Sequence, residues 1–252
     1  MKRQRLNWQE KVRKNMRKIM DFEHVKAVFE EYLNGYDREN DKVKLKIVHT
    51  YGVIRCSEEI GRRMGLQAED MELAKLIALL HDIGRFEQLK RFNSFEADTM
   101  DHATYGVQVL FEEGMIRQFI EEDTWDDVIR TAIAKHSDYE LTGITDERTL
   151  LHARLIRDAD KLDNCRVKLE DAMETLLDLS ADEVGKYAIS PKVREDAFAG
   201  KCICSKDRRT PMDYWVSYVA YFYDLNFRET LDIVAEEQYV KRIIGRVPYT
   251  NE

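Results

Sequence analysis

Residues 79–87 read Leu-Leu-His-Asp-Ile-Gly-Arg-Phe-Glu. They complete an apolar helical pattern that begins at Leu73 with spacings of three and four residues. Gly84 can adopt the left-handed conformation that ends a helix, so we predict that the helix stops there, with His81 and Asp82 in its last turn. An imidazole followed by a carboxylate, beside the negative end of a helix dipole, suits a divalent cation. A lone pair of this kind is more often a helix cap, so the metal hypothesis depends on further ligands elsewhere.

The composition favours an all-α protein. Of 252 residues, 44% are apolar and 35% charged, and there are only three prolines and eleven glycines. This balance suits long amphipathic helices around one sizeable core. We predict an N-terminal helical segment over 1–40, a central helical domain over 41–180 and a C-terminal helical extension over 181–252 packed on the same core.

Charge and apolar patterning limit the class of protein. The net charge of −8 argues against a general nucleic-acid binder, and an anionic substrate would need local cations or metal. The chain has no run of eighteen apolar residues and no apolar stretch after its basic start, so we expect a cytoplasmic protein without a signal peptide or membrane span. Four sparse cysteines are typical of reduced thiols: Cys56, Cys165, Cys202 and Cys204.

Helical patterns recur along the chain. We expect helices over 22–36, 41–64, 102–114, 124–136, 146–179 and 231–244. Asp101 and Asp146 are expected to cap two of them. The period is lost over 86–100, which we interpret as a loop across the site mouth.

Three other segments leave alternatives open. Residues 181–209 are either a peripheral insertion or a mobile cover. The aromatic-rich stretch 212–224 indicates core packing or a dimer surface more than a cofactor site, so a homodimer is one alternative. Residues 1–18 carry eight Lys or Arg and one acidic residue. They are interpreted as an amphipathic helix in preference to a basic arm for nucleic acid.

Three motifs together resemble a known family. They are Val-His-Thr-Tyr-Gly-Val at 48–53, Leu-His-Asp-Ile-Gly-Arg at 80–85 and Arg-Asp-Ala-Asp-Lys-Leu-Asp at 157–163. The order His, His-Asp, Asp on separate helices of an all-α chain resembles the HD superfamily of metal-dependent phosphohydrolases. The resemblance covers about residues 42–169 and implies a multi-helical HD bundle.

The resemblance also implies a ligand set. Its members would hold one metal: His49, His81, Asp82 and Asp160. Asp82 could also bridge to a second ion. Asp160 matches the family position better than Asp158 because it directly precedes Lys-Leu-Asp.

Two further histidine motifs resemble those that supply a second metal in the HD-GYP diesterases. They are His-Ala-Thr-Tyr-Gly from His102 and Ala-Lys-His-Ser around His136. The chain lacks a Gly-Tyr-Pro motif after the His-Asp pair. It therefore stays open whether His102 and His136 bind a second metal or touch substrate phosphate beside a single one.

The expected activity is hydrolysis of a nucleotide or nucleotide-like phosphate ester through metal-bound hydroxide. The mixed ligands suit one or two ions of Mn²⁺, Fe²⁺, Co²⁺, Ni²⁺, Zn²⁺ or Mg²⁺. We predict four catalytic residues: Asp82, Arg85, His102 and His136. Arg85 is the first choice for a phosphate contact, and weaker candidates are Lys135, Arg157 and Lys161.

Two alternatives accompany this hypothesis. One is a binuclear phosphodiesterase. The other, of a different class, is a non-catalytic HD domain that senses a nucleotide without turning it over. The partner expected in each case is a small phosphate ester, in preference to nucleic acid, and no membrane is expected.

Overall fold

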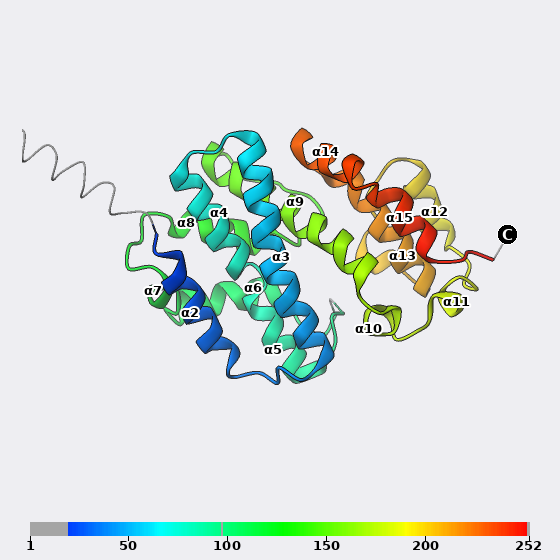
Figure 1. Cartoon of the computed structure of the whole chain (residues 1–252), viewed down its shortest axis with the longest axis horizontal. Coiled ribbons are helices and arrows are strands. Elements are labelled where there is room, and N and C mark those ends of the chain that lie inside the picture. The colour runs from blue at the N-terminus through cyan, green and yellow to red at the C-terminus, as the bar shows by residue number, and fades with distance from the viewer. Residues whose placement is uncertain (1–19, 97, 251–252) are drawn as a thin grey trace, which may run out of the picture.

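The computed structural model of the chain describes residues 20–96 and 98–250. Within these ranges it contains helices and no strand, which confirms the all-α class (Figure 1). No helix in them combines the length and the apolar character needed to cross a bilayer. The basic helix expected over 1–18 lies outside the described residues.

Two 24-residue helices form the centre of the fold, α3 (Asp41–Met64) and α9 (Glu147–Glu170), and they pack against each other. The Asn40 side chain accepts hydrogen bonds from the first turn of α3, and Gly65 ends that helix in the left-handed conformation. Asp146 caps α9 through the backbone N–H of Thr149. The predicted bounds of α3 and start of α9 are therefore confirmed.

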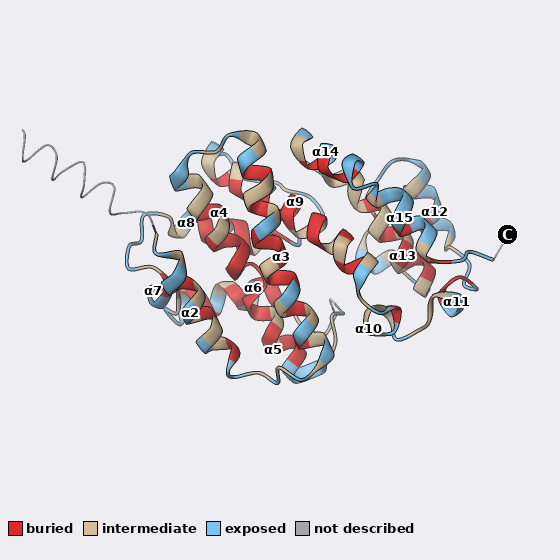
Figure 2. Ribbon diagram, viewed as in Figure 1, coloured by how far each residue is buried: buried red, intermediate tan, exposed pale blue. Residues whose placement is uncertain are grey.

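The helices fall into two groups, and the first group, which includes α3 and α9, encloses the larger core. The other members of this group are α2 (Phe22–Leu33), α4 (Ala68–Leu80), α5 (Ile83–Phe92), α6 (His102–Val107), a π-helical turn (Gln108–Glu112), α7 (Ile116–Phe119) and α8 (Asp126–Lys135). α4 and α8 supply much of the buried surface, together with α3 and α9 (Figure 2). This group carries all the predicted ligands.

The second group follows α9. It contains α10 (Met173–Leu177), α11 (Ala181–Val184), α12 (Pro191–Phe198), a 3₁₀ turn (Ser205–Asp207), α13 (Pro211–Ala220), a second 3₁₀ turn (Tyr221–Asp224), α14 (Arg228–Glu236) and α15 (Tyr239–Arg246). Figure 1 shows α9 running from the first group into the second. The second group has its own buried cluster, and α14 also contributes Ile233 and Val234 to the larger core.

The structure corrects the predicted role of Gly84. The helix ends earlier, at Leu80, and α5 begins at Ile83, so residues 86–92 are helical and not a loop. A Cβ on Gly84 would collide with the carbonyl oxygen of His102 and lie 2.7 Å from the backbone nitrogen of Gly106. Gly84 therefore permits α5 and α6 to touch, and does not serve as a left-handed stop.

Two other predicted helices are interrupted. The one expected over 146–179 ends at Glu170, because Asp171 and Ala172 adopt extended backbone before α10. The one expected over 231–244 is divided at Gln238, which takes a left-handed φ of 52°. The predicted helix over 102–114 becomes π-helical after Val107. The predicted domain limits at 40 and 180 stay predictions.

Candidate metal centre

The six predicted ligands come from five places in the fold and meet in one buried cluster. His49 lies in the middle of α3, and Asp160 in α9. His81 and Asp82 form the link between α4 and α5. His102 is the first residue of α6 and His136 follows the last residue of α8.

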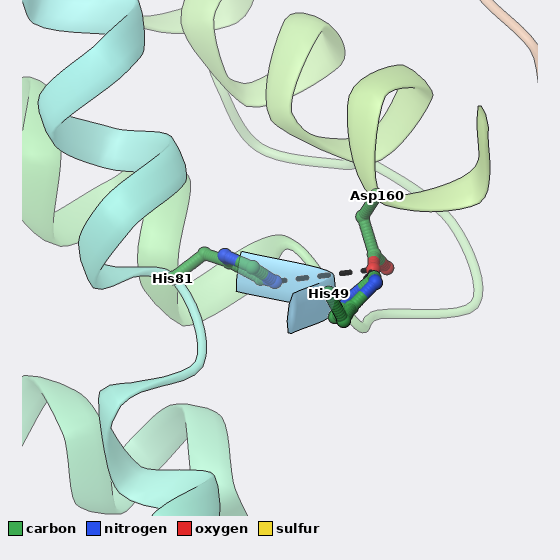
Figure 3. Close-up of side chains that lie close together, drawn as sticks. All are labelled: His49, His81 and Asp160. Atoms are coloured by element: carbon green, nitrogen blue, oxygen red, sulfur yellow. Dashed lines mark hydrogen bonds and ion pairs between the residues drawn. The ribbon is translucent and has the colours of Figure 1, made fainter. Parts of the chain in front are cut away.

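The first half of the cluster is a triad of His49, His81 and Asp160, whose ligand atoms lie within 4.8 Å of one another. Figure 3 shows both imidazole rings directed at the Asp160 carboxylate. Its Oδ1 is 2.9 Å from His49 Nε2 and 3.8 Å from His81 Nε2. Two imidazole nitrogens and a carboxylate oxygen are a donor set that divalent transition metals accept.

The second half is a triad of Asp82, His102 and His136, again within 4.8 Å. Asp82 Oδ1 lies 3.2 Å from His102 Nε2 and 3.6 Å from His136 Nε2. The other oxygen, Oδ2, lies 3.2 Å from Nε2 of His81 in the first triad. Asp82 thus presents one oxygen to each triad.

Two buried atoms at the junction between the two triads are suitable ligands for a cation. His81 Nε2 and Asp82 Oδ1 have no hydrogen-bond partner of suitable geometry, although several polar atoms surround them. Leaving a buried polar group unsatisfied costs about 1–3 kcal/mol. A metal ion bound by the deprotonated imidazole and the carboxylate would satisfy both atoms, so the residues present fit one.

Hydrogen bonds behind the ligands fix the orientation of three rings. His49 Nδ1 lies 2.8 Å from Asp163 Oδ2, and the Nδ1 atoms of His81 and His136 each lie 2.7 Å from a backbone carbonyl oxygen three residues earlier. Each contact leaves Nε2 directed at the centre, as ligating histidines usually are. Gly52 makes room for Asp163, because a Cβ there would collide with that carboxylate.

Two cations approach Asp82, one near each carboxylate oxygen. Lys46, one turn before His49 on α3, is buried and forms an ion pair with Asp82 Oδ2. An Arg85 guanidinium nitrogen lies 2.9 Å from His102 Nε2, and its Nε is 3.8 Å from Asp82 Oδ1. Arg85 therefore lies where the sequence placed it, beside the second triad.

The weaker cation candidates have other partners. Arg157 is buried and donates to backbone carbonyl oxygens at 135, 136 and 138 as well as to Asp224. Lys161 also pairs with Asp224, at 2.7 Å, and Lys135 lies 3.4 Å from Asp138. The neighbouring acid, Asp158, accepts hydrogen bonds from the segment 226–230 and does not join either triad.

The environment sets the charge on the cluster. Burial by itself would raise the pKa of Asp82, but the ammonium of Lys46 and the imidazole of His81 hold this pKa well below its usual range. Burial, reinforced by the Arg85 guanidinium, lowers the pKa of His102 to about 3. A charged carboxylate and a neutral imidazole are the forms that bind metal.

The cluster opens into a pocket of about 880 Å³ whose opposite wall comes from the second helix group. Tyr214, Tyr218 and Tyr221 line that wall. Core packing, one of the two roles predicted for 212–224, is confirmed for Trp215, which is buried, and for Tyr218, which packs against the same cluster. The predicted dimer surface stays a prediction. Residues 94–96 lie at the pocket, as predicted for the loop at the site mouth. Part of 202–211 also lines the pocket.

Two residues of this centre were missed as functional residues in the sequence. Lys46 is a charged residue on the buried face of α3, and Asp163 follows Asp160 by three residues on one face of α9. Their spacing from His49 and Asp160 was the available signal.

Comparison with known proteins agrees with this geometry. The model of the HD domain family matches residues 47–165. The chain contains an HD domain. HD domains belong to a superfamily of metal-dependent phosphohydrolases, and all six cluster residues lie inside the matched range.

A curated relative also carries an HD domain. The chain is 29% identical to Ribonuclease Y of Acetivibrio thermocellus over 165 residues, which make up 62% of this chain and 27% of the relative. The chain thus spans about a quarter of that protein. No solved structure matches the chain significantly.

Proposed function

We propose that this protein is a phosphohydrolase that holds two divalent metal ions, one at each triad, and hydrolyses a nucleotide or nucleotide-like phosphate ester. The observation that carries the proposal is the place of Asp82, with one oxygen facing each triad and two unsatisfied buried atoms at the junction. His49, His81 and Asp160 would hold one ion, His102 and His136 the other, and Asp82 would contact both.

Bound divalent ions would supply a nucleophile at neutral pH and stabilise charge on the phosphoryl oxygens. The protein's own side chains prepare the site for this chemistry. Asp163 and two backbone carbonyls orient the imidazoles, and Lys46 keeps Asp82 ionised. Arg85 is the cation best placed to bind a phosphoryl oxygen, because it lies beside the second triad and lines the pocket.

The pocket supports an anionic substrate of nucleotide size. Eight Lys or Arg and seven Asp or Glu side chains line it, whereas the whole chain has a net charge of −8. The pocket is therefore close to neutral while the chain as a whole is acidic, and bound metal ions would make it attract anions. The tyrosines of the far wall offer ring faces on which a base could stack.

A phosphodiester substrate is the second candidate. The second triad favours it, since two ions can contact both the attacking and the leaving oxygen. The name of the relative from Acetivibrio thermocellus also suggests a nucleic-acid diester. In both candidates the same residues bind the reacting phosphate.

The deciding experiment is elemental analysis of the purified protein beside Asp82→Ala and His102→Ala, with monoester and diester panels run on the same samples. We expect about two ions per chain in the wild type, one in His102→Ala, and hydrolysis lost in Asp82→Ala. The diester panel is bis(p-nitrophenyl) phosphate and the monoester panel is a set of nucleoside monophosphates.

Each other result contradicts a defined part of the proposal. One ion that persists in His102→Ala, with monoester turnover, would reduce the site to a single metal with His102 and His136 at the substrate. Metal and nucleotide binding without turnover would support the sensing alternative. Absence of metal after reconstitution would remove the catalytic proposal.

A further inference from the structure

One face of α9 joins the metal centre to the opposite end of the pocket. Asp160, Asn164 and Lys168 follow at intervals of four residues and all line the pocket. With a rise of about 1.5 Å per residue, Lys168 begins about 12 Å along the axis from Asp160. Lys168 also lies beyond residue 165, where the match to the HD family ends.

Lys168 is a buried cation without a counter-ion. Its exposed fraction is 7%, and its Nζ lies 4.2 Å from the centre of the Tyr218 ring. No carboxylate among the described residues is within ion-pair distance of it. The carboxylates of Asp160, Asp163 and Asp171 influence it only from farther away.

Arg208 repeats this arrangement one helical turn away. Its guanidinium lies 4.3 Å from the centre of the Tyr214 ring, and Tyr214 and Tyr218 are neighbours on α13. Arg208 likewise has no ion pair with a described carboxylate, and its Nε donates only to the backbone oxygen of Ser205. By contrast, Lys46 and Lys161 in the same pocket are each neutralised by an aspartate.

We propose that Lys168 and Arg208 bind a second phosphate group of the substrate, one that is not adjacent to the reacting phosphate. The inference rests on the proposed function, since it assumes that the first phosphate lies at the triads. The substrate class is then a nucleoside bisphosphate with its phosphates on two separate oxygens, and not a simple monophosphate.

Burial supports an anionic ligand at this place. It lowers the pKa of Lys168 to about 8, because the charged form is poorly solvated there. A phosphate oxygen beside the ammonium would compensate that lost solvation. Glu96 approaches the same wall but accepts a hydrogen bond from the Tyr214 hydroxyl, at 3.0 Å, and does not pair with either cation.

Three commercial compounds separate the geometry from general charge attraction. Adenosine 5′-monophosphate has one phosphate, adenosine 5′-diphosphate has two adjacent ones, and adenosine 3′,5′-bisphosphate has one on the 3′ oxygen and one on the 5′ oxygen of its ribose. We expect KM for the bisphosphate to be about tenfold lower than for the other two, the effect of one charge-assisted hydrogen bond.

Variants assign that preference to the two cations. Lys168→Met should raise KM for the bisphosphate about tenfold, with kcat and the monophosphate KM within about twofold of wild type. Arg208→Met, at a half-exposed position, should act in the same direction. Lys241→Met on the exposed surface of α15 is the control and should change nothing. Thermal unfolding of each variant checks the fold.

The results separate this inference from the proposed function. Equal KM values for the three compounds, or equal effects of Lys168→Met on all three, would overturn the second phosphate site even if hydrolysis is found. If the wild type hydrolyses none of them, calorimetric Kd values replace KM. A bisphosphate preference that depends on Lys168 would then uphold the second site while the proposed activity fails.

Discussion

The two walls of the pocket differ in how their charges are balanced. One wall, here called the HD wall, is formed by the helices that carry the two triads. On it, Lys46 pairs with Asp82, and Asp163 holds His49 in place. On the wall formed by the second helix group and the end of α9, Lys168 and Arg208 lie over tyrosine rings without carboxylate partners. Ion pairs with carboxylates hold cationic side chains in fixed positions, whereas cations without such partners can still attract an anionic ligand. We therefore expect changes on the HD wall to alter metal binding and kcat, and changes on the opposite wall to alter KM.

The largest effect should come from Asp82→Asn. The substitution keeps the shape of the side chain but removes the charge that both triads share. Because a metal contributes several kcal/mol of transition-state stabilisation, we expect kcat to fall by about 10³-fold or more. Steady-state hydrolysis together with elemental analysis measures both losses.

A folding control is needed because Asp82 also pairs with buried Lys46. The double variant Lys46→Met, Asp82→Asn removes both charges and should recover stability lost by an unpaired lysine without recovering activity. Asp82→Asn that retains both metals and wild-type kcat would show that the HD wall is not the catalytic one.

Local signals in the sequence were sufficient to predict many of the helix ends and ligands of the HD wall. Asp101 and Asp146 cap the helices they were expected to cap, and Gly65 ends α3. These features depend on neighbours within one turn, which the sequence displays directly. The six ligands could be predicted from motif resemblance, and the structure brings all six together.

The far wall and the helix contacts could not be predicted because they depend on distant segments. Gly84 looked like a helix stop, but the approach of α6 at His102 and Gly106 is what requires it. Tyr218 looked like a core residue, and only the folded position of α13 across from α9 places it at the pocket. Spacing in the sequence contains no information on such pairs.

Arg85→Met is expected to have the next largest effect. It removes the guanidinium beside His102 while keeping an apolar stem of similar length. A lost charge-assisted contact of about 1.5–3 kcal/mol predicts a decrease in kcat of roughly 10- to 100-fold with little change in metal content. Arg91→Met, on the exposed side of the same helix, is the matched control. Equal activity of the two variants would exclude Arg85 from the reaction.

Asp163→Asn should act on one triad only. The carboxylate behind His49 orients its ring, and loss of such a partner typically weakens metal binding 10- to 100-fold. We expect that change for the first ion and little change for the second, as measured by metal titration with a chelating indicator. Glu170→Gln serves as control, since it also removes a carboxylate partner of Arg166 but does not reach His49. Equal weakening of both ions would mean that the two triads do not bind independently.

The smallest expected effect is the pH dependence of KM on the far wall. Lys168, with a pKa lowered to about 8, is charged below that pH and neutral above it. Binding of the second phosphate should therefore weaken as pH rises, with KM for adenosine 3′,5′-bisphosphate several-fold higher at pH 9 than at pH 7.

Other groups facing Lys168 do not titrate in this interval. The carboxylates of Asp160 and Asp163 stay ionised, because their pKa values are lowered, and burial raises the pKa of Cys165 and of Tyr218 to about 12. Burial raises the pKa of the Asp171 carboxyl. The second ionisation of a phosphate monoester, near pH 6, is complete. In Lys168→Arg, where the cation does not titrate, the dependence should disappear. A slope that persists in this variant would assign the titration to the metal centre, and the two walls would no longer be separable by pH.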